Sequence, residues 1–121
     1  MLENKFYKLL DLHQSEDDSY LFKVELNKDC DVYKGHFPGS PIAPGVCNIQ
    51  MVRECVERVL SKKLRIDNIK QVKFISLVNP LDNTLYTISC KISVSDKIDV
   101  CDNMNSDSSD CMKINMSLVN L

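Results

Sequence analysis

The sequence lacks the features that would assign it to several large classes of protein. No apolar run approaches the ~20 residues that a membrane-spanning helix requires, so we expect no membrane span. The formal net charge is only −2, with acidic and basic residues interspersed, which gives no reason to expect a nucleic acid as partner. Residues 1–12 carry charged side chains where a signal peptide would have an apolar core, and we therefore expect a cytoplasmic location.

Metal-ligand spacing is also missing, although the chain contains six cysteines and two histidines. No two cysteines form a Cys-x-x-Cys pair, and His13 and His36 lie at unrelated spacings, so we expect no metal site. In the cytoplasm the thiols are expected to stay reduced. We interpret Cys47 as a small core residue and His13 as a solvated or structural side chain.

The length of 121 residues predicts a single domain, 1–121. From Val46 onward apolar residues recur at helical spacing over about fifteen residues. The opposite face of this helix is predicted to be polar and comprises Gln50, Arg53, Glu54, Glu57, Arg58 and Ser61. Alternating apolar residues predict strands at 20–28, 69–78, 84–95 and 111–121, with a weaker strand or helical turn at 4–13.

The segment 102–110 is polar and acidic, and we predict a mobile hairpin loop without a role in chemistry. One helix with an apolar stripe needs a sheet to cover that stripe. The order of elements therefore predicts an α+β fold in which a curved antiparallel sheet wraps around one central helix.

A stiff loop directly precedes the predicted helix. All three glycines and three of the four prolines of the protein lie within residues 35–46. Proline fixes φ and glycine permits positive φ, so a segment this rich in both predicts a specifically shaped loop. His36 lies within it, and histidine has an unperturbed pKa near physiological pH, which makes His36 a candidate acid or base.

The segment His36–Val46 resembles the active-site segment of the 3-hydroxyacyl-acyl-carrier-protein dehydratases of type II fatty acid synthesis. The resemblance implies a hot-dog fold and the dehydration of 3-hydroxyacyl thioesters to trans-2-enoyl thioesters. It further implies that the substrate is carried on the phosphopantetheine of acyl carrier protein, with no cofactor of the enzyme's own. Members of this family pair their sheets, so a homodimer or a higher even oligomer is expected.

The resemblance also assigns roles to individual residues. His36 would be the catalytic base, and the backbone N–H groups of Gly45 and Val46 would hold the thioester oxygen at the positive end of the helix. Gly45 would also let the thioester approach closely, because it has no Cβ. The residues of the substrate loop would be Phe37, Pro38, Gly39 and Pro44.

The family's second catalytic residue is a carboxylate fourteen positions after the histidine, where this chain has Gln50. An amide cannot deliver a proton at neutral pH. Glu54, one helical turn further on, is a possible substitute acid, and the alternative for Glu54 is a surface ion pair with Arg58. A third possibility is that His36 both takes and returns the proton while Gln50 orients the substrate.

Two other functions stay open beside dehydration. A hot-dog thioesterase would use the same backbone donors but needs a carboxylate nucleophile or base. A catalytically impaired acyl-chain-binding or dimer partner would explain Gln50 directly. For docking of an acidic carrier protein, the candidate basic residues are Lys62, Lys63, Arg65, Lys70 and Lys73.

Overall fold

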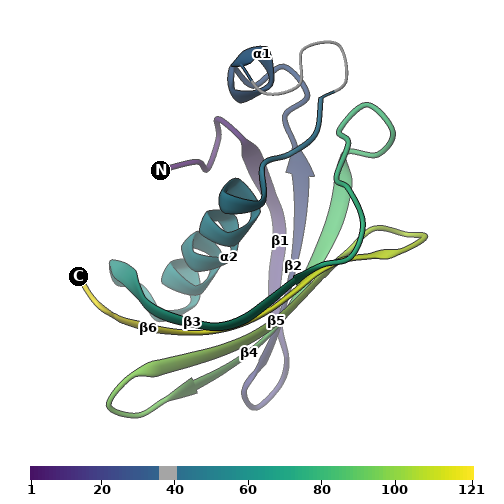
Figure 1. The fold of residues 1–121 in the computed structure, drawn as a ribbon. Helices are drawn as coiled ribbons and strands as arrows, with labels where there is room; N and C mark the ends of the chain where they lie inside the picture. Colours follow the sequence, from purple (N-terminus) through teal and green to yellow (C-terminus); the bar gives the residue numbers. More distant parts are fainter. Residues whose placement is uncertain (36–40) are drawn as a thin grey trace.

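The structure is a computed structural model that describes residues 1–35 and 41–121. Figure 1 shows its elements along the chain. Their bounds are β1 (Tyr7–Glu16), β2 (Ser19–Leu26), α1 (Val32–Gly35), α2 (Gly45–Leu60), β3 (Leu64–Phe74), β4 (Leu85–Val94), β5 (Ile98–Asn105) and β6 (Asp110–Asn120).

The six described strands form one antiparallel sheet in the order β1-β2-β4-β5-β6-β3. The sheet is strongly curved, and α2 lies on its concave side (Figure 1). This arrangement confirms the predicted α+β fold with a sheet wrapped around one central helix. It leaves β1 and β3 as the two edge strands.

The core lies between α2 and the inner face of the sheet. On β4 the alternating residues Ile88, Cys90 and Ile92 are buried, while their neighbours along the strand face outward. On α2 the residues Val52 and Val56 are fully buried, four positions apart on one face. Full burial of such an aliphatic side chain stabilises the fold by about 1.5–3 kcal/mol, so this interface holds the helix on the sheet.

Two predicted boundaries were wrong. The strand expected at 69–78 is β3 (Leu64–Phe74), which begins earlier because the buried Leu64 and its neighbours already pair with β6. The loop expected at 102–110 is a loop only between Asn105 and Asp110, because β5 continues through residues 102–105. Backbone pairing with β4 on one side and β6 on the other holds these polar residues in the sheet.

The pairing of β5 within the sheet buries the carboxyl group of Asp102. Its side chain points inward with the buried Val100 and Met104, and neither carboxyl oxygen has a hydrogen-bond partner in the described part of the chain. Burial raises the pKa of Asp102 well above its usual range. Asp102 lies opposite Cys90 on β4. Burial raises the pKa of the Cys90 thiol, and the Asp102 carboxyl raises it further by a smaller amount. The core therefore favours an uncharged Asp102.

Replacement of Asp102 by asparagine should remove a pH-dependent loss of stability. Because burial raises the pKa of folded Asp102, the unfolded chain releases this proton at a lower pH than the folded chain does. The stability of the unsubstituted protein therefore falls as pH rises from about 4 toward the folded pKa, and Asp102→Asn lacks this fall. Urea unfolding at pH 5 and pH 8 measures the difference in free energy of unfolding between Asp102→Asn and the unsubstituted protein. From pH 5 to pH 8 this difference should shift in favour of Asp102→Asn by at least about 1 kcal/mol.

The matched control is Asp99→Asn on the same strand, where the carboxylate is half-exposed and lies 3.2 Å from Lys70 Nζ. Its effect on stability should stay nearly constant over this pH interval. If the difference in free energy of unfolding between Asp102→Asn and the unsubstituted protein does not change with pH, the assignment of a buried, uncharged carboxyl group is contradicted.

Candidate active site

The start of α2 is the part of the predicted site that the structure describes. The helix begins at Gly45 after Pro44, whose extended backbone makes no side-chain cap. Cys47 and Asn48 donate their N–H groups to the Pro44 carbonyl at 3.0 and 3.2 Å. Gly45 and Val46 precede these donors, so their N–H groups have no acceptor within the helix and lie at the positive end of its dipole.

His36, Phe37, Pro38 and Gly39 lie outside the described residues, and their predicted roles stay predictions. The chain that follows them is anchored, because the Ala43 N–H donates to the Val78 carbonyl at 2.7 Å. This bond joins the approach to α2 to the segment that follows β3.

Gly45 has a packing requirement of its own. A Cβ on Gly45 would lie 2.6 Å from Cζ of Phe74, so only glycine accepts the aromatic ring in its present place. The ring belongs to the last residue of β3 and is 56% exposed. Val46, the next residue along the helix, is also exposed.

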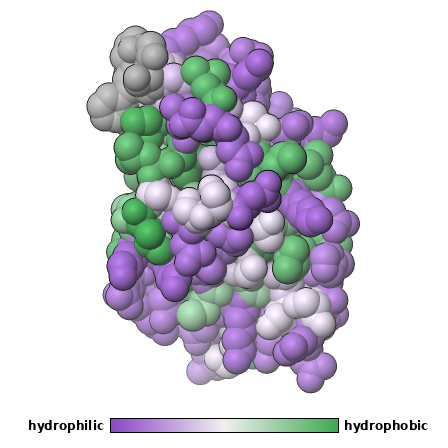
Figure 2. Space-filling view, turned by 90° about the vertical axis from the view of Figure 1, so that its right-hand side faces the viewer, coloured by the Kyte–Doolittle hydropathy of each residue, from purple (hydrophilic) through white to green (hydrophobic). Residues whose placement is uncertain are grey.

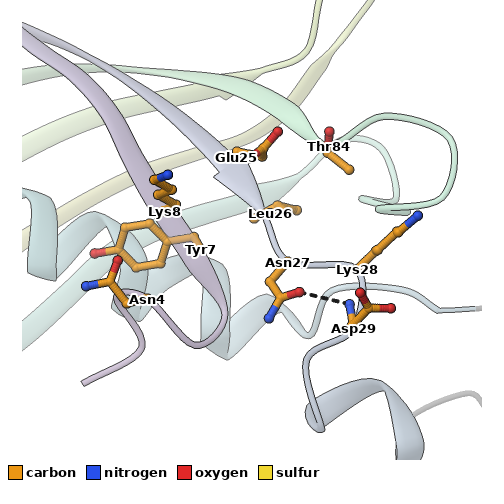
Figure 3. A pocket seen from close by; sticks show the side chains of 9 residues that line it. All are labelled: Asn4, Tyr7, Lys8, Glu25, Leu26, Asn27, Lys28, Asp29 and Thr84. Atoms are coloured by element: carbon orange, nitrogen blue, oxygen red, sulfur yellow. Dashed lines mark hydrogen bonds between the residues drawn. The ribbon is translucent and has the colours of Figure 1, made fainter.

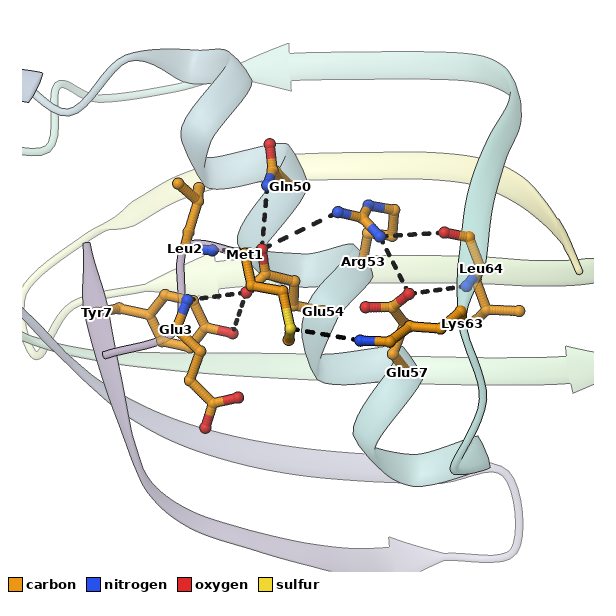
Figure 4. Close-up of polar contacts among 10 residues, drawn as sticks. All are labelled: Met1, Leu2, Glu3, Tyr7, Gln50, Arg53, Glu54, Glu57, Lys63 and Leu64. Atoms are coloured by element: carbon orange, nitrogen blue, oxygen red, sulfur yellow. Dashed lines mark hydrogen bonds and ion pairs between the residues drawn. The ribbon is translucent and has the colours of Figure 1, made fainter. Parts of the chain in front are cut away.

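Gln50 lies on the second turn of α2, half-buried, and its Nε2 donates to Oε2 of Glu54 at 3.1 Å (Figure 4). The structure thus joins the residue at the family's acid position to the carboxylate one turn later. Gln50 is held in one orientation by this bond.

Glu54 is fully buried, which corrects the prediction that it lies on the polar face of the helix. The N–H groups of Leu2 and Glu3 donate to its carboxylate at 2.8 and 2.9 Å, and the Tyr7 hydroxyl donates at 3.1 Å. Burial alone would raise the pKa of Glu54, but these bonds and the one from Gln50 outweigh it and lower the pKa. A carboxylate that accepts four donors holds no proton at neutral pH, which argues against Glu54 as a substitute acid.

The predicted surface pair between Glu54 and Arg58 is wrong, because Arg58 pairs instead with the side chain of Glu3. Glu57 is also buried rather than solvated. It accepts from Arg53 Nη1 at 3.1 Å and from the Leu64 N–H at 2.7 Å, and so ties the end of α2 to the start of β3.

Sequence reasoning missed the role of the N-terminal segment around Leu2, Glu3 and Tyr7. These residues lie 47 to 52 positions from Glu54, and no local pattern relates them. Two buried polar atoms near the site were also unforeseen. The Tyr33 hydroxyl on α1 and Asn48 Oδ1 on α2 have no hydrogen-bond partner within residues 1–35 and 41–121.

The structure also describes Cys47, which was predicted to be a core residue, and His13, which was predicted to be solvated or structural. Cys47 packs against the core, and burial together with the neighbouring Cys30 raises the pKa of its thiol. His13 is exposed, as predicted, with Nδ1 3.0 Å from Asp11 Oδ2.

A surface hollow of about 520 Å³ lies at the start of β1, the end of β2 and the approach to β4, and none of its lining residues belongs to α2. Lys8 and Lys28 lie at opposite ends of it, among the carboxylates of Glu25 and Asp29 (Figure 3). Its mixed charges select no particular ligand.

In the described ranges, no group of three or more His, Cys, Asp or Glu residues is placed to hold a metal ion. Neither described helix is long and apolar enough to span a membrane.

Replacement of Glu54 by glutamine should destabilise the protein by about 1–3 kcal/mol at pH 7, because one amide oxygen must serve donors that now share two carboxylate oxygens. Since the pKa of Glu54 is lowered on folding, its contribution is complete above the unfolded pKa of about 4.3 and is lost as pH falls below it. Urea unfolding of Glu54→Gln and of the exposed control Glu25→Gln at pH 7 and pH 3.5 measures this. If Glu54→Gln lowers the free energy of unfolding at pH 7 by no more than Glu25→Gln does, the stabilising role of the hydrogen bonds to Glu54 is contradicted.

Comparisons with known proteins relate the chain to dehydratases. The model of the ApeI-like family, described as ApeI dehydratase, matches residues 12–108. A 3-hydroxyacyl-[acyl-carrier-protein] dehydratase, FabZ from Levilactobacillus brevis, is 26% identical over 107 residues, which are 73% of this chain and 71% of the relative.

Solved structures share the fold. An uncharacterized protein from Erwinia carotovora subsp. atroseptica has a TM-score of 0.70 at 17% identity, with 95% of this chain and 97% of that chain covered. The dehydratase heterocomplex ApeI:P from Xenorhabdus doucetiae has a TM-score of 0.68 at 20% identity, with 93% and 97% covered. The predicted hot-dog fold is therefore confirmed. Because the family model spans most of the chain, this protein belongs to the ApeI-like family of dehydratases, related to the FabZ enzymes.

Proposed function

We propose that this protein dehydrates 3-hydroxyacyl thioesters on acyl carrier protein to trans-2-enoyl thioesters, in the biosynthesis of fatty acids or related lipids or polyenes. The observation that carries the proposal is the start of α2. It offers the N–H groups of Gly45 and Val46 a short distance after His36 in the sequence, in a chain that belongs to a dehydratase family.

The reaction can be assigned to these groups step by step. His36 removes a proton from C2 of the substrate, and the electron pair of that C–H bond forms the C2–C3 double bond. The charge that develops on the thioester oxygen is stabilised by the N–H groups of Gly45 and Val46. The C3–O bond breaks, and the departing hydroxide takes a proton to leave as water. Elimination of water needs no oxidant or reductant, so the protein requires no cofactor beyond the phosphopantetheine that carries the substrate.

The proton for the departing hydroxyl comes from His36 in this proposal. Gln50 cannot supply it, and the carboxylate of Glu54 is occupied by four donors. A dedicated general acid typically contributes ~10²–10⁴ in rate. A site in which one histidine takes and returns the proton is therefore expected to be slower than one with a separate acid.

We infer that the edge strand β3 pairs with a second copy, to give a homodimer or a higher even oligomer in the cytoplasm. Ile69 and Phe74 on β3 are 40% and 56% exposed, and Leu77 beyond it is 76% exposed. An unpaired edge with apolar side chains favours strand addition. On the face shown in Figure 2, separate hydrophobic patches interrupt the hydrophilic surface.

The proposed docking surface for acyl carrier protein consists of cations that follow the end of α2 and continue along β3. All are exposed in the structure, although Lys70 also lies 3.2 Å from Asp99. They are Lys62, Lys63, Arg65, Lys70 and Lys73. Cations clustered on consecutive elements would attract an acidic carrier.

A second candidate function is that of an impaired partner in a mixed complex, in which another chain supplies the missing acid. Gln50 favours it, as does the likeness in fold to a protein solved as a dehydratase heterocomplex. The thioesterase alternative has less support, because it needs an accessible carboxylate and Glu54 is fully buried.

Incubation of purified protein with a series of 3-hydroxyacyl-carrier-protein thioesters tests dehydration, with loss of one water followed by mass spectrometry. Turnover should disappear in His36→Ala, because the base is gone, and persist in the matched control His13→Ala, whose imidazole is exposed beside Asp11. Equal turnover in both variants would contradict His36 as the base. No turnover by the unsubstituted protein alone, with turnover after addition of a second family member, would favour the mixed complex.

Replacement of Gln50 by glutamate should create the missing acid. The new carboxyl group would lie about as close to Glu54 as the Gln50 amide does now, at 3.1 Å, and two adjacent carboxyl groups cannot both ionise readily. The pKa of the introduced group should therefore be raised, and turnover should increase by about 10² or more below that pKa and decline above it. A pH–rate profile with Gln50→Met as the control measures this, and a rate unchanged from that of the native chain would contradict it.

A further inference from the structure

The amide of Gln50 has two chemically different ends, a donor at Nε2 and an acceptor at Oε1. Nε2 donates to Glu54 Oε2 at 3.1 Å. The carbonyl oxygen points in the opposite direction, away from Glu54, in the close-up of this region (Figure 4). The orientation of this amide decides which kind of ligand atom Gln50 can bind.

The surroundings of Glu54 determine that orientation. The backbone N–H groups of Leu2 and Glu3 can only donate, and each donates to Glu54. The Tyr7 hydroxyl donates to the same carboxylate at 3.1 Å. An ionised carboxylate has acceptors and no donor, so Gln50 must turn its NH₂ group toward it. A reversed amide would place its oxygen against Glu54 Oε2, with no hydrogen between them.

The position of Gln50 relates its carbonyl oxygen to the proposed substrate site. Gln50 follows Val46 by four residues, so both lie on one face of α2, about 6 Å apart along the helix axis. Helical side chains lean toward the helix start, which brings the Gln50 amide toward the N–H groups proposed to hold the thioester oxygen. Substrate atoms two or three bonds from the thioester carbonyl would lie near it.

We propose that Glu54 is a positioning residue that holds the Gln50 amide with its oxygen toward the substrate, so that the site selects acyl thioesters with a hydrogen-bond donor at C3. This inference rests on the proposed function. A 3-hydroxyl group donates to Oε1 of Gln50, a 3-oxo group presents a second acceptor to it, and a saturated chain presents neither. The buried carboxylate thus acts on specificity through Gln50, without touching the substrate.

Binding to His36→Ala protein tests this inference, since that background does not turn the substrate over. The ligands are three pantetheine thioesters of one chain length, with a 3-hydroxyl, a 3-oxo or a saturated acyl group. The hydroxyacyl thioester should bind about three- to tenfold more tightly than the saturated one. Adding Gln50→Met, which keeps the length of the side chain without its acceptor, should abolish that preference.

Adding Glu54→Gln to the His36→Ala protein instead should leave Gln50 in place but allow its amide group to adopt either of its two orientations. The hydroxyl preference should then fall, and the 3-oxo thioester should gain about three- to tenfold relative to the saturated one. The matched control is Glu57→Gln, which disturbs a buried carboxylate on the same helix that bonds to Arg53 and Leu64 rather than to Gln50. It should change the affinity for all three thioesters equally.

Proton exchange of the Gln50 side chain gives a second test that needs no substitution of Glu54. In the folded protein, one Nε2 proton should exchange with water more slowly than the other, because it is donated to Glu54. Two equally fast protons would overturn the inference. So would a hydroxyl preference that survives Gln50→Met, or equal losses for all three thioesters in Glu54→Gln. Dehydratase turnover alongside any of these results would leave the proposed function standing, whereas a chain that neither binds nor converts any thioester would overturn both.

Discussion

The buried carboxylate of Glu54 joins parts of the chain that are far apart in sequence. It accepts hydrogen bonds from the backbone of Leu2 and Glu3, from the Tyr7 hydroxyl and from the Gln50 amide. A charge removed from water costs several kcal/mol unless such donors surround it. Folding therefore requires the N-terminal segment to lie against α2, and the Tyr7 hydroxyl joins the helix to the start of β1.

A second buried carboxylate, three residues further along the helix, ties α2 to the edge strand β3. Glu57 accepts from Arg53 and from the N–H of Leu64, the first residue of β3 (Figure 4). The apolar face of α2 packs on the sheet, with Val52 and Val56 fully buried. With contacts on three sides, α2 has one position and one direction. Donors at its start are thereby pre-organised, which is the property that stabilisation of a developing charge requires.

The local elements could be predicted where their periodicity is strong. The helix was expected from Val46 and begins at Gly45, and the strand expected at 20–28 is β2 (Ser19–Leu26). The strand β5 could not be predicted, because Asp102, Asn103 and Asn105 have low strand propensity. Pairing with β4 and β6 holds them in the sheet, and the cost is a buried carboxyl group without a partner. The helical pattern was likewise misleading at Glu54 and Glu57, since it assigns every charged residue to the solvent.

For the site, the motif from His36 to Val46 was enough to indicate the family and the start of the helix, because residues a few positions apart determine the loop and its helix start. The sequence alone also identified Gln50 as the departure from the family's acid. Only the tertiary structure decided that Glu54 is an anchor and that the Gln50 amide turns its oxygen outward. The physical reason is that hydrogen-bond partners 47 to 52 residues away determine the environment of Glu54, and chain packing brings them together.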